Sequence, residues 1–112
     1  MALTVAELAE KLNLKFIAGT VGSTNVIEGA YVGDLLSWVM GRAKESDAWI
    51  TIQGHENIIA VAALAAVSCV VVCESAELYG RTAEKAEREG IPLLTSELPA
   101  YELAVKLHEI LL

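Results

Sequence analysis

This sequence of 112 residues is short of positive charge. Eight Lys and Arg stand against fifteen Asp and Glu, which gives a formal net charge of −7 and a pI of about 4.7. Proteins that hold nucleic acid or anionic membrane surfaces need clustered Lys and Arg to contact the phosphates. The charge balance therefore argues against both partners. The length fits a single domain over residues 1–112, because a compact domain usually needs ~100 to 150 residues.

A long apolar run is also missing, although 54 % of the residues are hydrophobic. The main apolar stretch, residues 58–73, contains Ser68 and changes from Ala-rich to Val-rich halfway. A membrane-spanning helix needs ~20 predominantly apolar residues, so we interpret this stretch as a buried helix followed by a buried strand. The first residues show no basic segment ahead of an apolar core, which favours a cytoplasmic protein.

Several chemical signatures are absent. The two cysteines, Cys69 and Cys73, stand in one β-branched run and would lie ~13 Å apart on a strand, too far for a disulfide or a shared metal. The sequence has no Gly-x-Gly-x-x-Gly or Walker loop, no Gly-x-Ser-x-Gly elbow, and no His, Cys and carboxylate cluster at ligand spacing. We therefore predict no metal site, no cofactor and no nucleophilic hydrolase, and we interpret both cysteines as core residues.

The sequence does contain an alternation of helix and strand patterns. The capping box Thr4-Val-Ala-Glu7 predicts a helix over 5–12, and a strand over 14–18 is followed by a flexible polar loop over 20–25. An extended segment over 29–33 comes next. We predict that it is followed by a helix over 35–43, with Asp34 as its N-cap and with Leu35, Leu36, Val39 and Met40 facing inward. The remaining predicted elements alternate: a strand over 48–52, a helix over 58–66, a strand over 68–73, a helix over 77–89, a strand over 91–94, and a helix from Pro99 to Leu112. Alternation with short connections predicts parallel strands with helices on both faces. The expected fold class is thus α/β, a three-layer α/β/α single domain with a mostly parallel sheet.

Polar residues follow the predicted strands, and in open parallel sheets ligands bind outside the carboxyl ends of the strands. The candidate ligand-binding residues at this edge are Gly33, Asp34, Gln53, Gly54, His55, Asn57, Glu74, Ser75, Thr95 and Ser96. Two interpretations of the 53–57 turn stay open. In one, His55 acts as a base or binds an anion with Gln53 and the helix amides. In the other, the turn is an ordinary strand-to-helix connection. In either case Gly54 permits a tight turn or a close backbone approach by a ligand, and Asn57 or Glu56 can cap the following helix.

The helix over 58–66 is apolar on nearly every face. Such a helix must be covered on both sides, and the sheet of a small domain covers only one. This pattern predicts a homodimer or a protein partner, unless the N-terminal helix supplies the second cover.

The residues 48–63, 69–75 and 89–94, with 31–36 as an early matching segment, resemble a DRTGG domain, which is similar to the N-terminal domain of HPr kinase/phosphorylase. The resemblance covers roughly residues 3–112. It implies a three-layer α/β domain that dimerises and has a regulatory or interaction role. In pyrophosphatases this domain accompanies adenine-nucleotide-sensing CBS domains, and free-standing copies in anaerobes are often encoded beside iron hydrogenase components.

This chain departs from the family pattern at two turns. It has Gly54-His55-Glu56 where many members have Gly-Asp-Arg, and Cys73-Glu74-Ser75 where they have Thr-Gly-Gly. The changes remove an Arg that would clamp phosphate and two glycines that would form a backbone nest, and Glu74 repels phosphate.

The leading hypothesis is a non-catalytic regulatory or protein-interaction domain, homodimeric and accessory to a metabolic or hydrogenase-type redox complex. The alternative is a sensor of a small, adenine-nucleotide-like ligand at the carboxyl edge of the sheet. A third hypothesis is an enzyme with His55 as general base and Asp34 or Glu74 as its orienting group, which requires those side chains within ~3.2 Å of each other.

Overall fold

The main sheet has five strands in the order β2-β7-β6-β5-β4. The structure, a computed structural model, describes residues 2–112. Strands β4, β5, β6 and β7 are parallel, and β2 joins the β7 edge antiparallel. Their bounds are β2 (Lys15–Ala18), β4 (Gly29–Val32), β5 (Asp47–Thr51), β6 (Cys69–Val72) and β7 (Leu93–Thr95). The predicted α/β class with a mostly parallel sheet is confirmed.

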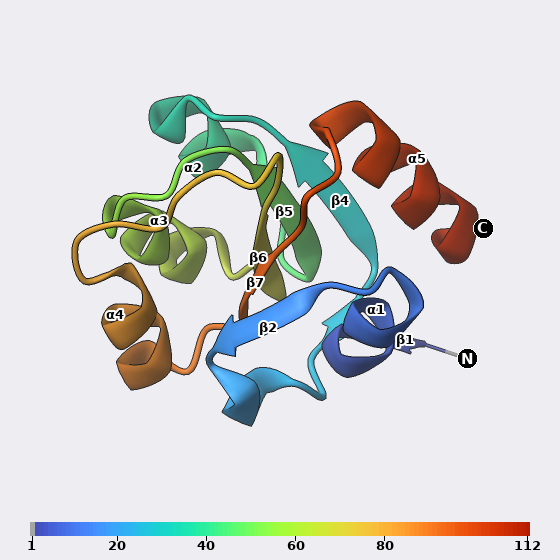
Figure 1. The fold of residues 1–112 in the computed structure, drawn as a ribbon, viewed down its shortest axis with the longest axis horizontal. Coiled ribbons are helices and arrows are strands. Elements are labelled where there is room, and N and C mark those ends of the chain that lie inside the picture. Colours follow the sequence, from blue (N-terminus) through green and yellow to red (C-terminus); the bar gives the residue numbers. More distant parts are fainter. Residues whose placement is uncertain (1) are drawn as a thin grey trace.

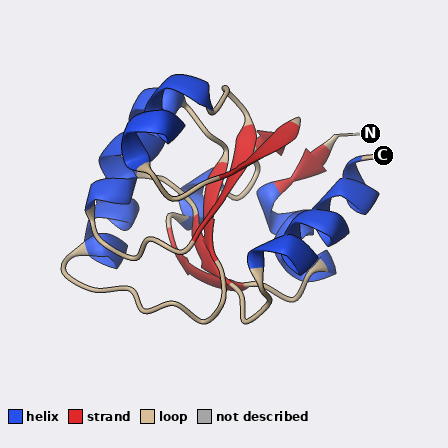
Figure 2. Ribbon diagram, turned by 90° about the horizontal axis from the view of Figure 1, so that it is seen from above, coloured by secondary structure: helices blue, strands red, loops and turns tan. Residues whose placement is uncertain are grey.

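Helices cover both faces of this sheet and make three layers (Figures 1 and 2). One face carries α1 (Val5–Lys11) and α5 (Ala100–Leu111). The other carries α2 (Leu36–Arg42), α3 (Asn57–Ala65) and α4 (Thr82–Glu89). Because successive side chains of a strand point to opposite faces, Ile50 packs on the α1/α5 side and Trp49 on the α2/α3/α4 side. None of the helices in residues 2–112 combines the length and hydropathy that crossing a bilayer requires.

Local signals explain several element boundaries. The capping box of α1 forms as predicted, with the Thr4 amide donating to Glu7 Oε1 at 2.9 Å and the Glu7 amide donating to Thr4 Oγ1 at 3.2 Å. Gly90 ends α4 in the left-handed conformation that glycine adopts without strain. Both cysteines are buried and unpaired, and every residue of β6 is buried, as expected of a strand covered on two faces.

Two N-terminal segments differ from the prediction. Residues 3–4 and 26–27 form a small antiparallel sheet of β1 (Leu3–Thr4) and β3 (Val26–Ile27). The loop expected to be flexible contains a 3₁₀ helix, η1 (Thr20–Gly22). It is held in place because Glu87 accepts the Gly19 amide at 2.9 Å and the Asn25 side chain donates to the Ser68 carbonyl at 3.2 Å.

Two predictions about where helices begin are wrong. Helix α4 begins at Thr82 instead of residue 77, because the Tyr79 amide donates to the Gly54 carbonyl and Gly80 takes a left-handed conformation. Asp34 does not cap α2, whose N-cap position is Leu35 without a side-chain hydrogen bond. Leu35 and Met40, expected to face inward, are exposed.

Helix α3 is covered from within the chain. It packs between α2 and α4, which buries residues such as Ile58 and Val61 and leaves Leu64 72 % exposed. The N-terminal helix lies on the opposite face of the sheet, so it does not supply this cover. The apolar character of α3 therefore does not require a partner, and homodimerisation stays a prediction.

Candidate functional site

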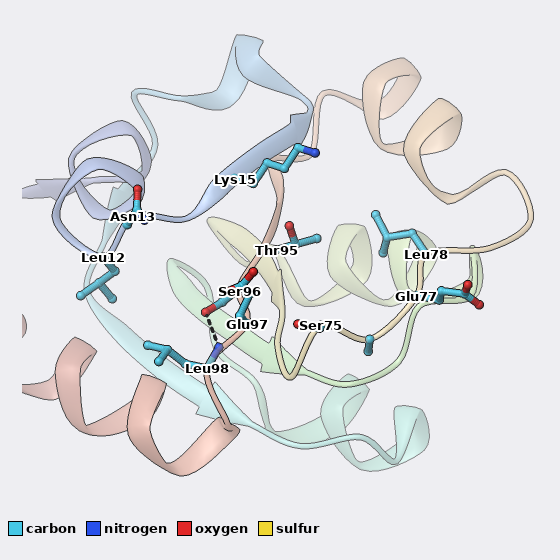
Figure 3. A pocket seen from close by; sticks show the side chains of 11 residues that line it. Leu12, Asn13, Lys15, Ser75, Glu77, Leu78, Thr95, Ser96, Glu97 and Leu98 are labelled. Atoms are coloured by element: carbon cyan, nitrogen blue, oxygen red, sulfur yellow. Dashed lines mark hydrogen bonds between the residues drawn. The ribbon is translucent and has the colours of Figure 1, made fainter.

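A cavity of about 760 Å³ lies where β6 and β7 end, beside the start of β2. Figure 3 shows Thr95 and Ser96 in its middle, with Leu12 and Asn13 on one side, Glu77 and Leu78 on the other, and Lys15 next to Thr95. Its lining residues are Leu12, Asn13, Lys15, Ser75, Ala76, Glu77, Leu78, Thr95, Ser96, Glu97 and Leu98. The cavity occupies the carboxyl edge of the parallel strands, which is the edge the sequence predicts for ligand binding.

The groups around this cavity are mixed in character. Lys15 supplies one ammonium group, and Glu77 and Glu97 supply two carboxylates. Hydroxyl groups and the Asn13 amide add groups that both donate and accept hydrogen bonds, and three leucines form apolar wall. Thr95 is half-buried. Such a lining suits a small polar molecule with an apolar part.

The turn after β6 contributes little to anion binding. Glu74 and Ser75 have φ of 60° and 54°, left-handed values that glycine adopts more easily than other residues. Their amides donate to the carbonyls of Leu98 at 2.9 Å and Ser96 at 3.0 Å, and the Ala76 amide donates to the Cys73 carbonyl at 3.1 Å. Because all three amides have protein partners, this turn offers no free nest for a phosphate group.

The turn after β5 packs against the segment before α4. The Gly54 carbonyl accepts the Tyr79 amide at 3.1 Å and the Thr82 hydroxyl at 2.8 Å. A Cβ on Gly54 would lie 1.8 Å from the Glu77 carbonyl oxygen. Gly54 therefore permits a close approach, but the group that approaches is the chain's own backbone and not the ligand that the sequence analysis expects.

The polar residues next to Gly54 are also engaged within the protein. His55 Nδ1 accepts the Asn57 amide at 3.1 Å, and the His55 ring meets the edge of Tyr79 with centroids 5.4 Å apart. Glu56 pairs with Lys85 at 2.6 Å and accepts the Arg81 amide, and these contacts lower the pKa of Glu56 below its ordinary value. The geometry favours the strand-to-helix connection as the interpretation of this turn.

Asp34 and Gln53 connect the ends of β4 and β5. Asp34 Oδ1 accepts the Thr51 hydroxyl at 2.9 Å and the Ile52 amide at 2.8 Å, and Gln53 Nε2 donates to the Asp34 carbonyl at 3.0 Å. The Gly33 carbonyl accepts the indole N–H of Trp49 at 2.9 Å. In the described part of the chain, no hydrogen bond joins His55 to Asp34 or to Glu74. The contact that the enzyme hypothesis needs is thus not formed.

The cavity gathers three of the ten predicted site residues, Ser75, Thr95 and Ser96. The other seven lie outside its lining: Gly33, Asp34, Gln53, Gly54, His55, Asn57 and Glu74. The sequence interpretation missed Lys15 and Asn13, because it placed only the ends of parallel strands at this edge. Since β2 runs antiparallel to β7, the start of β2 lies at the same edge. The antiparallel direction of that strand places both residues at this edge, and no pattern in the sequence indicates this direction.

The cysteines add no reactive group to the site. Burial raises the pKa of Cys69 to about 12, and burial together with the nearby Glu74 raises the pKa of Cys73. Both thiols are therefore protonated near neutral pH, and a protonated thiol is a poor nucleophile and a poor metal ligand. Within residues 2–112, no group of three His, Cys, Asp or Glu side chains is placed to hold a metal ion.

No protein-family model matches this sequence, and a search of the curated proteins finds no match. One solved structure with a similar fold comprises the CBS and DRTGG domains of the regulatory region of Clostridium perfringens pyrophosphatase, complexed with the activator diadenosine tetraphosphate. The TM-score is 0.67 at 13 % sequence identity, over 92 % of this chain and 45 % of that chain. The chain thus spans less than half the length of this structural relative. At this identity the likeness establishes a shared α/β fold, which is consistent with the resemblance to DRTGG domains.

Proposed function

We propose that this chain is a non-catalytic regulatory domain that binds a small molecule in the cavity at the carboxyl ends of β6 and β7. The observation that carries the proposal is the cavity itself, which combines Lys15, two carboxylates, hydroxyl groups and apolar wall at the edge where α/β sheets bind ligands. The shared fold with a regulatory region that was crystallised with an activator supports the same role.

The charges of the cavity favour a ligand with an ammonium group and at most one acidic group. One Lys and two Glu line the cavity, in a chain of net charge −7. A polyphosphate would bring several negative charges to this lining and would find no free amides in the turn after β6. A zwitterionic metabolite can place its carboxylate near Lys15 and its ammonium group near Glu77 or Glu97.

An adenine-nucleotide sensor is the second candidate. It is favoured by the fold shared with a region that holds diadenosine tetraphosphate. An adenine ring would use the apolar wall of Leu12, Leu78 and Leu98 and the hydroxyl groups. In this candidate Lys15 is the sole cation of the lining that can meet a phosphate.

A regulatory domain of this kind acts by changing the activity of another protein. We propose that the chain is cytoplasmic, works as a homodimer and is accessory to a larger metabolic or redox complex. Because free-standing DRTGG domains are often encoded beside iron hydrogenase components, these components are the first partners to test. Co-purification of tagged chain with such a component supports this part of the proposal, and its absence from all complexes contradicts it.

Thermal unfolding with added metabolites tests the ligand proposal. A ligand at a hundred times its Kd stabilises the native state by about 2.7 kcal/mol, which raises the Tm of a domain this size by more than ~5 °C. We expect this shift with at least one zwitterionic metabolite. It should fall strongly in Lys15→Ala and Thr95→Val and persist in the matched exposed controls Lys44→Ala and Thr20→Val.

Other outcomes separate the candidates. A shift with adenine nucleotides that Lys15→Ala abolishes favours the nucleotide sensor over the zwitterion sensor. A shift that persists in both cavity variants contradicts this cavity as the binding site. Absence of any shift across both classes contradicts the sensor function.

A further inference from the structure

Helix α5 has two unlike flanks beside its buried side. On one flank, Lys106 and Glu109 line a shallow cavity together with residues at the end of α1. On the other flank, His108 and Leu112 line a cavity of about 360 Å³ with Ala30 of β4. The charged flank therefore faces α1, and the opposite flank borders β4.

The flank that borders β4 is apolar and exposed. Tyr101, Val105, His108 and Leu112 follow at intervals of four, three and four residues, which places them along one stripe of the helix. Tyr101 is 80 % exposed, Val105 41 % and Leu112 89 %. The side chains of the stripe include no Asp, Glu, Lys or Arg, although the chain as a whole is strongly acidic.

Strand β4 continues this surface. Within the described residues it pairs only with β5, so its other edge is open. Ala30 and Val32 lie opposite Ala48 and Ile50, whose side chains pack on the α1/α5 face of the sheet. Residues opposite each other in neighbouring strands point to the same face, so Ala30 and Val32 also point to the α5 side, and both stay exposed. Ile52, two residues beyond Ile50, is exposed as well.

We infer that a second copy of this chain docks on the surface formed by these residues, which we name the α5–β4 face. Its members are Ala30, Val32, Ile52, Tyr101, Val105 and Leu112. An exposed aromatic side chain offers about 150 to 250 Å² and aliphatic ones offer less, so the face exposes on the order of 500 Å² of apolar surface. A standard interface buries roughly 800 Å² on each partner, of which the apolar part is about 65 % in homodimers. The two areas agree.

Symmetry and the composition of the α5 stripe favour a second copy as the occupant. Two chains of net charge −7 repel each other, and the stripe offers a contact whose side chains include no Asp, Glu, Lys or Arg, with Glu28 and Asp34 at its border. A twofold axis beside β4 would set the open edges of the two β4 strands antiparallel and bring the two α5 stripes together. A twofold contact needs a self-complementary surface, and an apolar stripe next to an open strand edge meets this need. This inference rests on the homodimeric part of the proposed function and locates its interface.

Size-exclusion chromatography with light scattering on the full chain at micromolar concentration tests the inference. We expect a dimer for the unmodified chain. Val105→Asp and Val32→Asp should raise the dimer Kd at least a hundredfold and yield monomers, because each places two carboxylates in the twofold contact. Val21→Asp is the matched control, since Val21 is 80 % exposed on η1, away from α5 (Figure 1), and should leave the dimer intact.

The failures of the two proposals can be told apart. A monomeric unmodified chain overturns the inference, as does a dimer that survives both Val105→Asp and Val32→Asp. Circular dichroism checks that each variant is folded, and Tyr101→Ser, at an 80 % exposed position, provides a milder test that should also weaken the dimer. The thermal shift with zwitterionic metabolites, measured on the same monomeric variants, reports on the cavity that Lys15 and Thr95 line, independently of dimer formation.

Discussion

Gly54→Ala is the substitution whose effect follows most directly from the structure. The added Cβ would lie 1.8 Å from the Glu77 carbonyl oxygen, whereas ordinary contact begins at 3.4 Å, so the two backbone segments must separate by about 1.6 Å. The atom in the way belongs to the backbone, and no side-chain rotation relieves the clash. The Gly54 carbonyl would move away from the Tyr79 amide and the Thr82 hydroxyl, which it now accepts at 3.1 and 2.8 Å.

The expected cost combines two contributions. Overpacking a well-filled site costs roughly 1–3 kcal/mol. Each weakened hydrogen bond to the Gly54 carbonyl adds about 1 kcal/mol, although the buried Thr82 hydroxyl keeps the Tyr79 carbonyl as an acceptor at 2.7 Å. Gly54→Ala should therefore lower the free energy of unfolding by about 3–5 kcal/mol, a large share of the roughly 5–15 kcal/mol typical of a single domain.

Urea unfolding followed by tryptophan fluorescence, which responds to the exposure of the buried Trp49, measures this change. Gly41→Ala is the matched control, because a Cβ at this helical position meets nothing within 4 Å. The control should gain about 0.5–1 kcal/mol, since alanine is the better helix residue. If Gly54→Ala lies within 1 kcal/mol of the unmodified protein, the packing of residues 53–57 against 77–81 is refuted.

Three further predictions concern the turns after β5 and β6 and the segment before α4. Thr82→Val should cost about 1–2 kcal/mol in urea unfolding, because it leaves the Gly54 carbonyl with one donor fewer; an unchanged midpoint would contradict the bond. Ser75 has φ of 54°, a left-handed value that strains residues other than glycine. The free energy of unfolding of Ser75→Gly should therefore equal or exceed that of the unmodified protein, and that of Ser75→Val should be lower by more than ~1 kcal/mol. The reverse order would show that the turn carries no strain. The contact with Lys85 is the main cause of the lowered Glu56 pKa, so the stabilisation by this carboxylate is complete above its ordinary value of 4.5 and disappears as the pH falls through the lowered pKa. Glu56→Gln should consequently lose less stability than the unmodified protein on acidification below 4.5, and equal losses would exclude the linkage.

The overall fold could be predicted because its elements carry strong patterns. The continuous apolar run of β6 and the strand and helix alternation after residue 48 lead directly to a parallel sheet between two helix layers. Strands β1 and β3 were missed because two residues are too few to show a period of two. The hydrophobic pattern of β2 does not indicate the direction of the strand, so its antiparallel pairing was not predictable from pattern alone.

The candidate site was only partly predictable for a related reason. Ser75, Thr95 and Ser96 were found because the ends of parallel strands share one edge. A polar turn after a strand has the same composition whether it faces a ligand or another loop. His55 and Gly54 face the segment before α4, and only the tertiary structure distinguishes these two cases.

The central claim, a ligand cavity beside the start of β2, is tested most directly by following amide NMR shifts during titration with the zwitterionic and nucleotide panel. We expect shifts concentrated at Asn13, Lys15, Ser75 and Thr95, with the 53–57 turn unaffected. Shifts centred on the 53–57 turn, or no shifts with any compound at millimolar concentration, would contradict it.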